Sequence, residues 1–248
     1  TLLLSVFVYL SNNELWLKKT TFFALGVVIL QGLFGGLTVL FFLPAYISII
    51  HAILAQTFLL ISIFIAFCLS KRNKEIINNK SNIAHLSIPA ISVTITIYIQ
   101  LIIGAIMRHT ESGLAIPDFP MSGGFILPLF NQAMVDAIHS MHFDAGLEFV
   151  EFYQIIIHFA HRIGALAVSL AIGYLSLKLF QLKIQFSIVH KLLLMMIFLL
   201  IIQIFLGALT ILTVKNPLIT SIHVLNGAII LGTSALFILN VRPLNWIK

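Results

Sequence analysis

Ionisable side chains inside apolar stretches are the first sign of chemistry in this sequence. Residues 151–164, EFYQIIIHFAHRIG, lead from Glu151 into an apolar helix of roughly 26 residues that carries His158, His161 and Arg162. Ionisable groups inside a membrane are costly, so each is by default a functional-site hypothesis. Imidazole is the usual axial ligand of haem iron. We therefore expect His161 to ligate a haem and Arg162 to neutralise its propionates. The alternative is a histidine pair that only hydrogen-bonds to neighbouring helices.

Composition sets the class of protein that must position these residues. The chain has 248 residues, of which 60% are hydrophobic and 9% are charged, and its mean hydropathy is +1.11. These values predict an all-α polytopic membrane protein. The sequence pI near 9.6 does not indicate nucleic-acid binding, because the basic residues lie in short loops. The single cysteine, Cys68, excludes an intrachain disulfide and a cysteine-based metal site.

Apolar segments predict six complete membrane spans. They lie at about 21–43, 46–69, 86–107, 152–177, 189–213 and 218–240. Residues 1–10 are apolar but too short to span, and we interpret them as the tail of a helix that begins before Thr1.

Basic residues in short loops predict the orientation. Eleven of the fourteen Lys and Arg residues fall on one side: Lys18, Lys19, Lys71, Arg72, Lys74, Lys80, Lys178, Lys183, Lys191, Arg242 and Lys248. That side, with the C-terminus, is expected to be cytoplasmic. Arg108 and Lys215 fall on the outer side with the long loop 108–151.

This topology places three histidines in one layer. His51 and His223 lie about five residues into their spans from the outer side, and His161 about nine, or roughly 8 to 14 Å deep at 1.5 Å per residue. The sequence leaves the role of His158 open. We interpret the other five histidines as solvated: His85, His109, His139, His142 and His190.

An internal repeat relates two parts of the chain. Residues 31–51 and 203–223 align without a gap at an offset of 172, pairing Gln31 with Gln203, Gly35 with Gly207, Thr38 with Thr210, and His51 with His223. This pattern predicts a pseudo-symmetric repeat of two four-helix bundles that run in the same direction. Residues 1–70 would belong to the first, incomplete bundle, 71–85 to a cytoplasmic linker, and 86–248 to the complete second bundle. The first-bundle partner of His161 would fall at position −11, before Thr1.

Small residues next to His161 and His223 are consistent in size with a cofactor held inside the bundle. Gly164, Ala165, Gly227 and Ala228 would let a flat macrocycle approach, or they are ordinary helix-packing residues. Gln31, Gln100 and Gln203 each precede a glycine by four residues, and we interpret them as structural.

The long loop carries a second amphipathic pattern. Met134, Ile138, Met141 and Ala145 recur at helical spacing, which predicts a helix on the outer membrane surface. Such a helix could roof the haem site, or only shield the helix ends.

Three segments carry a resemblance to a known family. QLIIGAIMRHTESGLAIPDFP, IHFAHRIGA and SIHVLNGAIILG resemble the second half of a haem A synthase, and QGLFGGLTV with ISIIH resembles its first half. The resemblance covers nearly the whole chain. It implies eight helices in the cell inner membrane, oxidation of the C8 methyl of haem O to a formyl group, and release of haem A for cytochrome oxidase assembly.

The resemblance also implies roles for individual residues. His161 and His223 would ligate an auxiliary haem b, with Arg162 and Arg108 among the cofactor-binding residues, and His51 would act at the substrate haem. The helix with the catalytic glutamate, in a Glu-x-x-His-Arg motif, is expected before Thr1. Haem O synthase and oxidase assembly factors would be partners.

Two other functions remain open. A non-catalytic b-type cytochrome would keep His161 and His223 but would need no substrate site at His51. A proton-relaying transporter would bind no haem and would favour acidic residues within the spans, where the sequence has none. The electron donor is also open.

Overall fold

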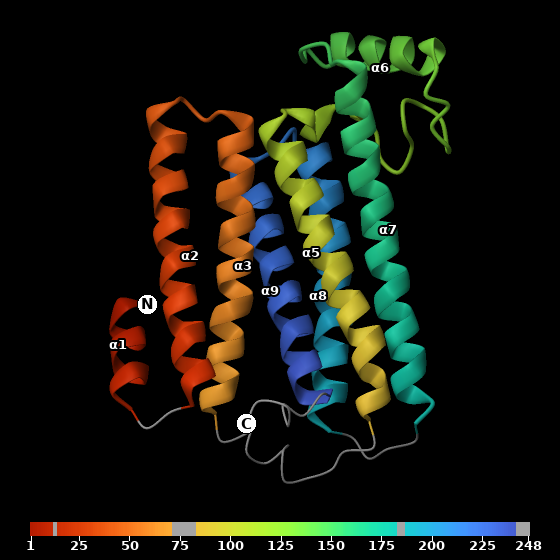
Figure 1. Cartoon of the computed structure of the whole chain (residues 1–248). Coiled ribbons are helices and arrows are strands. Elements are labelled where there is room, and N and C mark those ends of the chain that lie inside the picture. The colour runs from red at the N-terminus through yellow and green to blue at the C-terminus, as the bar shows by residue number, and fades with distance from the viewer. Residues whose placement is uncertain (12–13, 71–82, 183–186, 242–248) are drawn as a thin grey trace.

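Long helices that stand side by side make up the structure (Figure 1). A computed structural model describes residues 1–11, 14–70, 83–182 and 187–241. The helices are α1 (Leu2–Leu10), α2 (Leu15–Leu40), α3 (Ala45–Leu69), α5 (Ser87–His109), α6 (Gln132–Asp144), α7 (Phe152–Phe180), α8 (Ile188–Leu212) and α9 (Pro217–Val241), with 3₁₀ turns at Ala84–Leu86 and Ser112–Leu114. The all-α polytopic prediction is therefore confirmed.

Six of these helices are long and apolar enough to cross a membrane: α2, α3, α5, α7, α8 and α9. Each corresponds to one predicted span. A helix satisfies its own backbone hydrogen bonds, which is why continuous apolar sequence folds this way where no water is available. α6 lies across the top of α7 at the outer end of the predicted topology (Figure 1).

The beginning of α2 differs from the prediction. The sequence predicted a span from about residue 21, with Lys18 and Lys19 in the loop before it, but the helix begins at Leu15. Lysine is a good helix former, and the ammonium of Lys18 lies 5.5 Å from the centre of the Tyr9 ring in α1. The hydroxyl of Thr20 donates to the Trp16 carbonyl at 2.9 Å, so this polar residue is satisfied within the helix. α1 packs on α2 through Val8 and Leu17.

The main core lies among α5, α7, α8 and α9. Its fully buried side chains include Val93, Leu175, Leu193 and Phe237. α3 joins this group through a hydrogen bond of 2.7 Å between the hydroxyls of Thr57 and Tyr98 of α5.

The bundle boundaries 1–70, 71–85 and 86–248 stay a prediction, and residues 71–82 of the linker lie outside the described part of the chain. The same holds for Lys71, Arg72, Lys74, Lys80, Lys183, Arg242 and Lys248, seven of the eleven basic residues used for orientation. The other four, Lys18, Lys19, Lys178 and Lys191, are on helix ends opposite α6 (Figure 1).

Replacing a buried phenylalanine of the main core should destabilise the bundle. Phe237→Ala leaves a cavity at a side chain that is 0% exposed, and such changes cost about 3 to 5 kcal/mol. Phe198→Ala in α8, where the side chain is 63% exposed, is the matched control and should cost far less. Unfolding of both variants in detergent, followed by circular dichroism, measures the difference. Equal losses would contradict this packing.

Candidate functional site

His161 of α7 and His223 of α9 come together inside the bundle. Their ring centres are 6.5 Å apart and their ring planes make an angle of 62°. An imidazole nitrogen bonds a transition metal at about 2 Å, and the ring centre lies roughly 1 Å behind it, so two imidazoles on opposite sides of one ion have centres roughly 6 Å apart. The observed distance between the ring centres is close to this value, and the rings meet edge to face.

Two imidazoles alone would leave most metal ions with open positions. Among the described residues, no group of three or more His, Cys, Asp or Glu side chains is placed to hold a metal ion. A haem supplies the remaining ligands from its own macrocycle, and its iron then takes axial ligands from the protein. The chemistry of the donor set therefore fits a haem.

His51 lies elsewhere, on α3 against α2. Its Nδ1 donates to the backbone carbonyl of Gln31 at 2.8 Å. The sequence predicted that His51 lies at a similar depth to His161 and His223. In the structure, His51 contacts α2 from α3 and is separate from that pair.

Each of the three histidines lies against a glycine of a neighbouring helix. A Cβ added at Gly35 would meet the ring of His51 at 2.9 Å, one at Gly104 would meet His161 at 3.1 Å, and one at Gly207 would meet His223 at 3.3 Å. A larger residue at any of these positions would displace an imidazole. These are the three glycines that follow a glutamine by four residues.

The glutamines also contact the histidines. Gln100 Nε2 lies 3.1 Å from His161 Nδ1, and Gln203 Nε2 lies 3.3 Å from His223 Nε2. The recurrent Gln-x-x-x-Gly spacing was visible in the sequence, but its rotation toward a histidine was not. Each of the three histidines is thus paired with a Gln-x-x-x-Gly segment of a neighbouring helix.

Two further glycines leave room for these glutamines. A Cβ at Gly164 would overlap the carboxamide of Gln100, and one at Gly227 would lie 2.9 Å from Leu101 and 3.4 Å from Gln203. The sequence left open whether these glycines make room for a macrocycle or only pack helices together. In the structure, the space beside them is taken by the glutamines and Leu101.

Three side chains of α7 hold the loop that follows α5. Gln154, His158 and Arg162 lie four residues apart and so share one face of the helix. Gln154 donates to the Thr110 carbonyl at 2.9 Å. His158 is 2% exposed, and its Nδ1 lies 3.1 Å from the Ser112 carbonyl oxygen. His158 therefore supports the loop, which answers a question that the sequence left open.

The Arg162 guanidinium contacts the same loop. It donates to the carbonyls of Asp118 at 2.7 Å, Met121 at 2.6 Å and Ile116 at 3.2 Å, and lies 3.4 Å from the Ser122 hydroxyl. Its Nε is buried and has no hydrogen-bond partner among the described residues. Arg162 thus fixes the loop and keeps one donor for a further acceptor. Arg108, also predicted to bind the cofactor, is exposed at the end of α5.

The loop is further ordered by local hydrogen bonds. The Asp118 carboxylate accepts from the backbone N–H groups of Gly123 and Gly124 at 2.8 and 2.7 Å. Both glycines have positive φ, at +64° and +79°, which residues with a Cβ rarely adopt. The first part of the loop therefore contains ordered turns.

α6 packs onto this loop rather than standing free. Met134 and Ile138 are buried in a cluster with Ile116 of the loop and Ile155 of α7. Ala145, which the sequence placed on the apolar face, is exposed just after the helix. α6 therefore covers the loop and the beginning of α7.

Two of the five histidines interpreted as solvated are buried. His142 is 1% exposed, and its Nε2 lies 3.1 Å from the Leu114 carbonyl oxygen, so it ties α6 to the loop. His190 is also buried and caps α8 together with Ser187. The prediction was wrong for both histidines. A residue's position near a helix end does not reveal whether neighbouring segments fold over its side chain. His85 is exposed, and His109 is half-buried.

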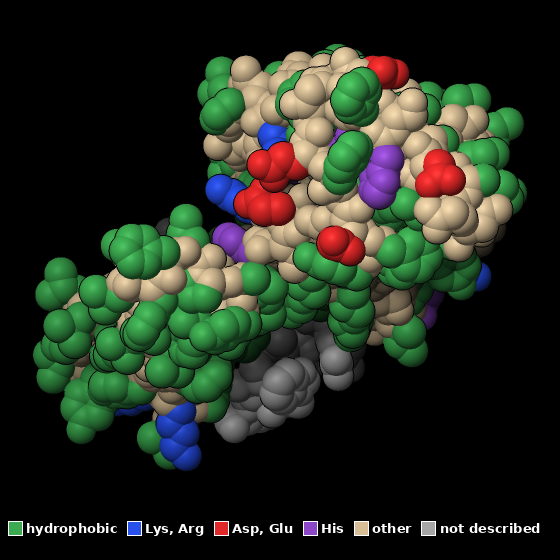
Figure 2. Space-filling view, turned by 90° about the horizontal axis from the view of Figure 1, so that it is seen from above, with side chains coloured by type: hydrophobic (Ala, Val, Ile, Leu, Met, Phe, Trp, Pro, Cys, Tyr) green, Lys and Arg blue, Asp and Glu red, His purple; other side chains and the backbone are tan. Residues whose placement is uncertain are grey.

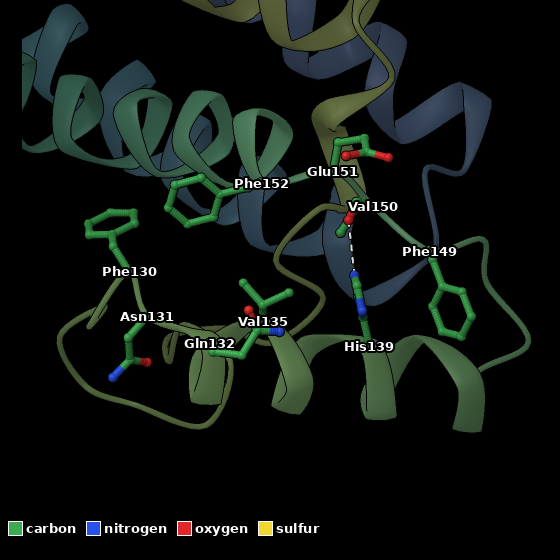
Figure 3. A pocket seen from close by; sticks show the side chains of 9 residues that line it. All are labelled: Phe130, Asn131, Gln132, Val135, His139, Phe149, Val150, Glu151 and Phe152. Carbon is green, nitrogen blue, oxygen red and sulfur yellow. Dashed lines mark hydrogen bonds between the residues drawn. The ribbon is translucent and has the colours of Figure 1, made fainter.

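A cavity of about 450 Å³ lies between α6 and the beginning of α7 (Figure 3). His139 lies on its wall and hydrogen-bonds to the Val150 carbonyl at 3.0 Å. Phe130, Phe149 and Phe152 provide aromatic walls. The cavity is about nine residues along α7 from His161, so it is separate from the histidine pair. Acidic and histidine side chains are seen on the outer face around this region (Figure 2).

The fold and site define a polytopic helical membrane protein with a pair of facing intramembrane histidines. Residues 1–235 match the model of the family described as cytochrome oxidase assembly protein, and the chain belongs to that family.

Curated relatives are named haem A synthase. One from Staphylococcus haemolyticus (strain JCSC1435) is 27% identical over 143 residues, which is 58% of this chain and 40% of the relative. One from Rickettsia felis is 28% identical over 142 residues, covering 57% of this chain and 38% of the relative. One from Staphylococcus epidermidis is 24% identical over 230 residues, covering 90% and 67%. The matches thus span about two fifths of the first two relatives and about two thirds of the third.

Removing the Arg162 guanidinium should loosen the loop after α5. Hydrogen bonds from a charged donor contribute about 1.5 to 3 kcal/mol each, so Arg162→Met should speed amide hydrogen exchange in residues 110–124 by about tenfold or more. Arg108→Met, at an exposed arginine, is the control and should leave this exchange unchanged. Unchanged exchange in Arg162→Met would show that the loop does not depend on this side chain.

Proposed function

We propose that this chain acts in haem A synthesis, oxidising the C8 methyl group of haem O to a formyl group. The observation that carries the proposal is the pair of facing rings of His161 and His223, 6.5 Å apart within the bundle. Membership of the cytochrome oxidase assembly family and relatives named haem A synthase support the choice of reaction.

In this proposal His161 and His223 are the axial ligands of an auxiliary haem b. Arg162 would offer its unpartnered Nε to a propionate while its other nitrogens keep the loop in place. Arg108, exposed at the outer end of α5, would be the second basic group near the propionates. A bound haem supplies the redox chemistry, and the protein orients it and tunes its ligands.

His51 would serve the substrate haem. A backbone carbonyl only accepts hydrogen bonds, so the contact with Gln31 requires the proton of His51 on Nδ1 and leaves the lone pair of Nε2 free. Metal-binding histidines commonly have this arrangement, with the distal nitrogen donating to a carbonyl. His51 is therefore preset as a ligand before any cofactor binds.

The remaining assignments follow from the same proposal. The protein would lie in the cell inner membrane with its C-terminus in the cytoplasm. It would receive haem O from a haem O synthase and deliver haem A to cytochrome oxidase assembly.

Losing either paired histidine should remove the auxiliary haem. We expect His161→Ala and His223→Ala to lower the haem B extracted from the purified protein by about tenfold or more, because removing even a supporting residue of a metal ligand costs about 10- to 100-fold in affinity. His85→Ala, at an exposed histidine, is the control. Wild-type protein with haem B and haem O or A supports the synthase. Haem B alone would indicate an electron-carrying cytochrome, and a colourless protein would indicate a transporter.

Displacing His51 should affect product formation but not the auxiliary haem. In the full-length protein, expressed in cells that supply haem O, His51→Met should abolish haem A formation with unchanged haem B. Gly35→Ala places a Cβ 2.9 Å from the His51 ring and should reduce haem A formation by up to about 100-fold, since misplacement by 1 Å can cost that much. Gly36→Ala is the matched control, because a Cβ there meets nothing within 4 Å. Equal product from the Gly35 and Gly36 variants would remove His51 from the substrate site.

A further inference from the structure

The loop between α5 and α6 contains a short apolar segment whose side chains are exposed. Residues 126–129, which we call the apolar tip, have the sequence ILPL. The side chains of Ile126, Leu127 and Leu129 are 82%, 75% and 54% exposed. From Phe119 to Val135 the sequence contains no ionisable side chain. Contiguous exposed apolar side chains of this kind mark a surface that contacts a membrane or another protein.

Contacts with α7 give the depth of the tip. Gln154 of α7 donates to the carbonyl of Thr110, the residue directly after α5, so Gln154 is level with the outer end of α5. Phe130, directly after the tip, has its ring centre 5.3 Å from that of Phe159. Phe159 lies five residues beyond Gln154, or roughly 8 Å further into the bundle at 1.5 Å per residue. The end of the tip is therefore within the depth of the predicted span.

The part of the loop before the tip lies still deeper. Arg162 is eight residues beyond Gln154, or roughly 12 Å, and it donates to the carbonyls of Asp118 and Met121. The loop lies beside α7 on the side away from α2 and α3 (Figure 1). It therefore descends along the flank of the bundle, where a span would otherwise meet lipid.

A loop at this depth needs partners for its backbone, because hydrocarbon offers none. Arg162 binds three of its carbonyls, and the Asp118 carboxylate accepts from two of its N–H groups. Ser122 and Phe125 exchange two backbone hydrogen bonds, at 2.8 and 3.3 Å. Within the tip, Pro128 has no N–H to satisfy. The backbone is thus suited to an environment with little water.

α6 has the opposite character on its far side. Met134 and Ile138 face the loop and are buried, whereas Gln132, Asp136 and Ser140 are exposed. Gln132 Nε2 donates to Asp136 Oδ1 at 2.8 Å, so these polar groups also pair with each other. A polar helix face above and an apolar tip below agree on one orientation at a membrane surface.

We propose that the apolar tip inserts into the outer leaflet of the bilayer beside α7 and anchors the loop there. Lipid is the occupant because the tip continues an apolar stripe of α7. Phe152, Ile156 and Ile163 of that stripe are 44%, 45% and 48% exposed, and the Phe130 ring lies 6.5 Å from that of Phe152 (Figure 3). Interfacial apolar groups enter a bilayer by about 5 to 10 Å, which matches the depth along α7. The proposal does not depend on a bound haem.

Spin labels on single cysteines test the insertion directly. Cys68→Ala removes the one cysteine of the sequence. Labels are then placed by Ile126→Cys, Leu127→Cys or Leu129→Cys, and the chain is reconstituted in nanodiscs of phosphatidylcholine and phosphatidylglycerol. All three side chains are exposed, so the labels leave the packing intact.

Two further positions calibrate the measurement. Ile163→Cys, on the exposed stripe of α7, is the lipid control, and Ser140→Cys, on the polar face of α6, is the water control. We expect the tip labels to collide more often with oxygen than with a water-soluble nickel chelate, as at Ile163, and the Ser140 label to show the reverse. Tip labels as accessible to the chelate as the Ser140 label would overturn the proposal. Low accessibility to both reagents would also overturn it, because a second copy or another protein would then cover the tip.

A charge at the tip tests whether insertion anchors the loop. A carboxylate is costly in hydrocarbon, so Leu127→Glu should expose the Ile126→Cys label to the chelate and raise amide hydrogen exchange in residues 119–125. Ser140→Glu is the matched control and should change neither. Unchanged label accessibility and exchange in Leu127→Glu would show that the tip is not held by the bilayer.

Discussion

The cost of placing polar groups in a membrane is the constraint on which this structure depends. An unpartnered polar group there has no water to compensate it, so the histidines need hydrogen-bond partners on neighbouring helices. Gln31 serves His51, Gln100 serves His161, and Gln203 serves His223. These contacts also fix the rotation of α2, α5 and α8 relative to the histidine-bearing helices. The same hydrogen bonds therefore position the histidines and set how the helices pack against one another.

α7 has two roles on two faces. Its face with Gln154, His158 and Arg162 holds the loop after α5, and His161 lies on the side directed toward α9. α6 then covers the loop through Met134 and Ile138. The backbone carbonyls of this loop are thus bound to the helix that also carries the proposed ligand His161. One helix, α7, therefore contacts both the loop and the histidine pair.

The two repeat segments place their histidines alike but give them different hydrogen-bond partners. His51 and His223 both lie against a glycine that follows a glutamine, but a backbone carbonyl binds one ring and a side-chain amide contacts the other. Only the second has Asn226 behind it.

The sequence by itself determined the all-α membrane class and the six spans with the histidines that they carry, because hydropathy and spacing along a helix are properties of the chain alone. It also contained the Gln-x-x-x-Gly spacing, but not the helix rotation that brings each of these segments against an imidazole. Tertiary structure decided that His161 and His223 face each other, that His158 and Arg162 hold a loop, and that His142 is buried. These outcomes depend on how helices rotate against one another and where a loop folds back. Many residues far apart in the chain share in fixing that geometry, and no local pattern specifies it.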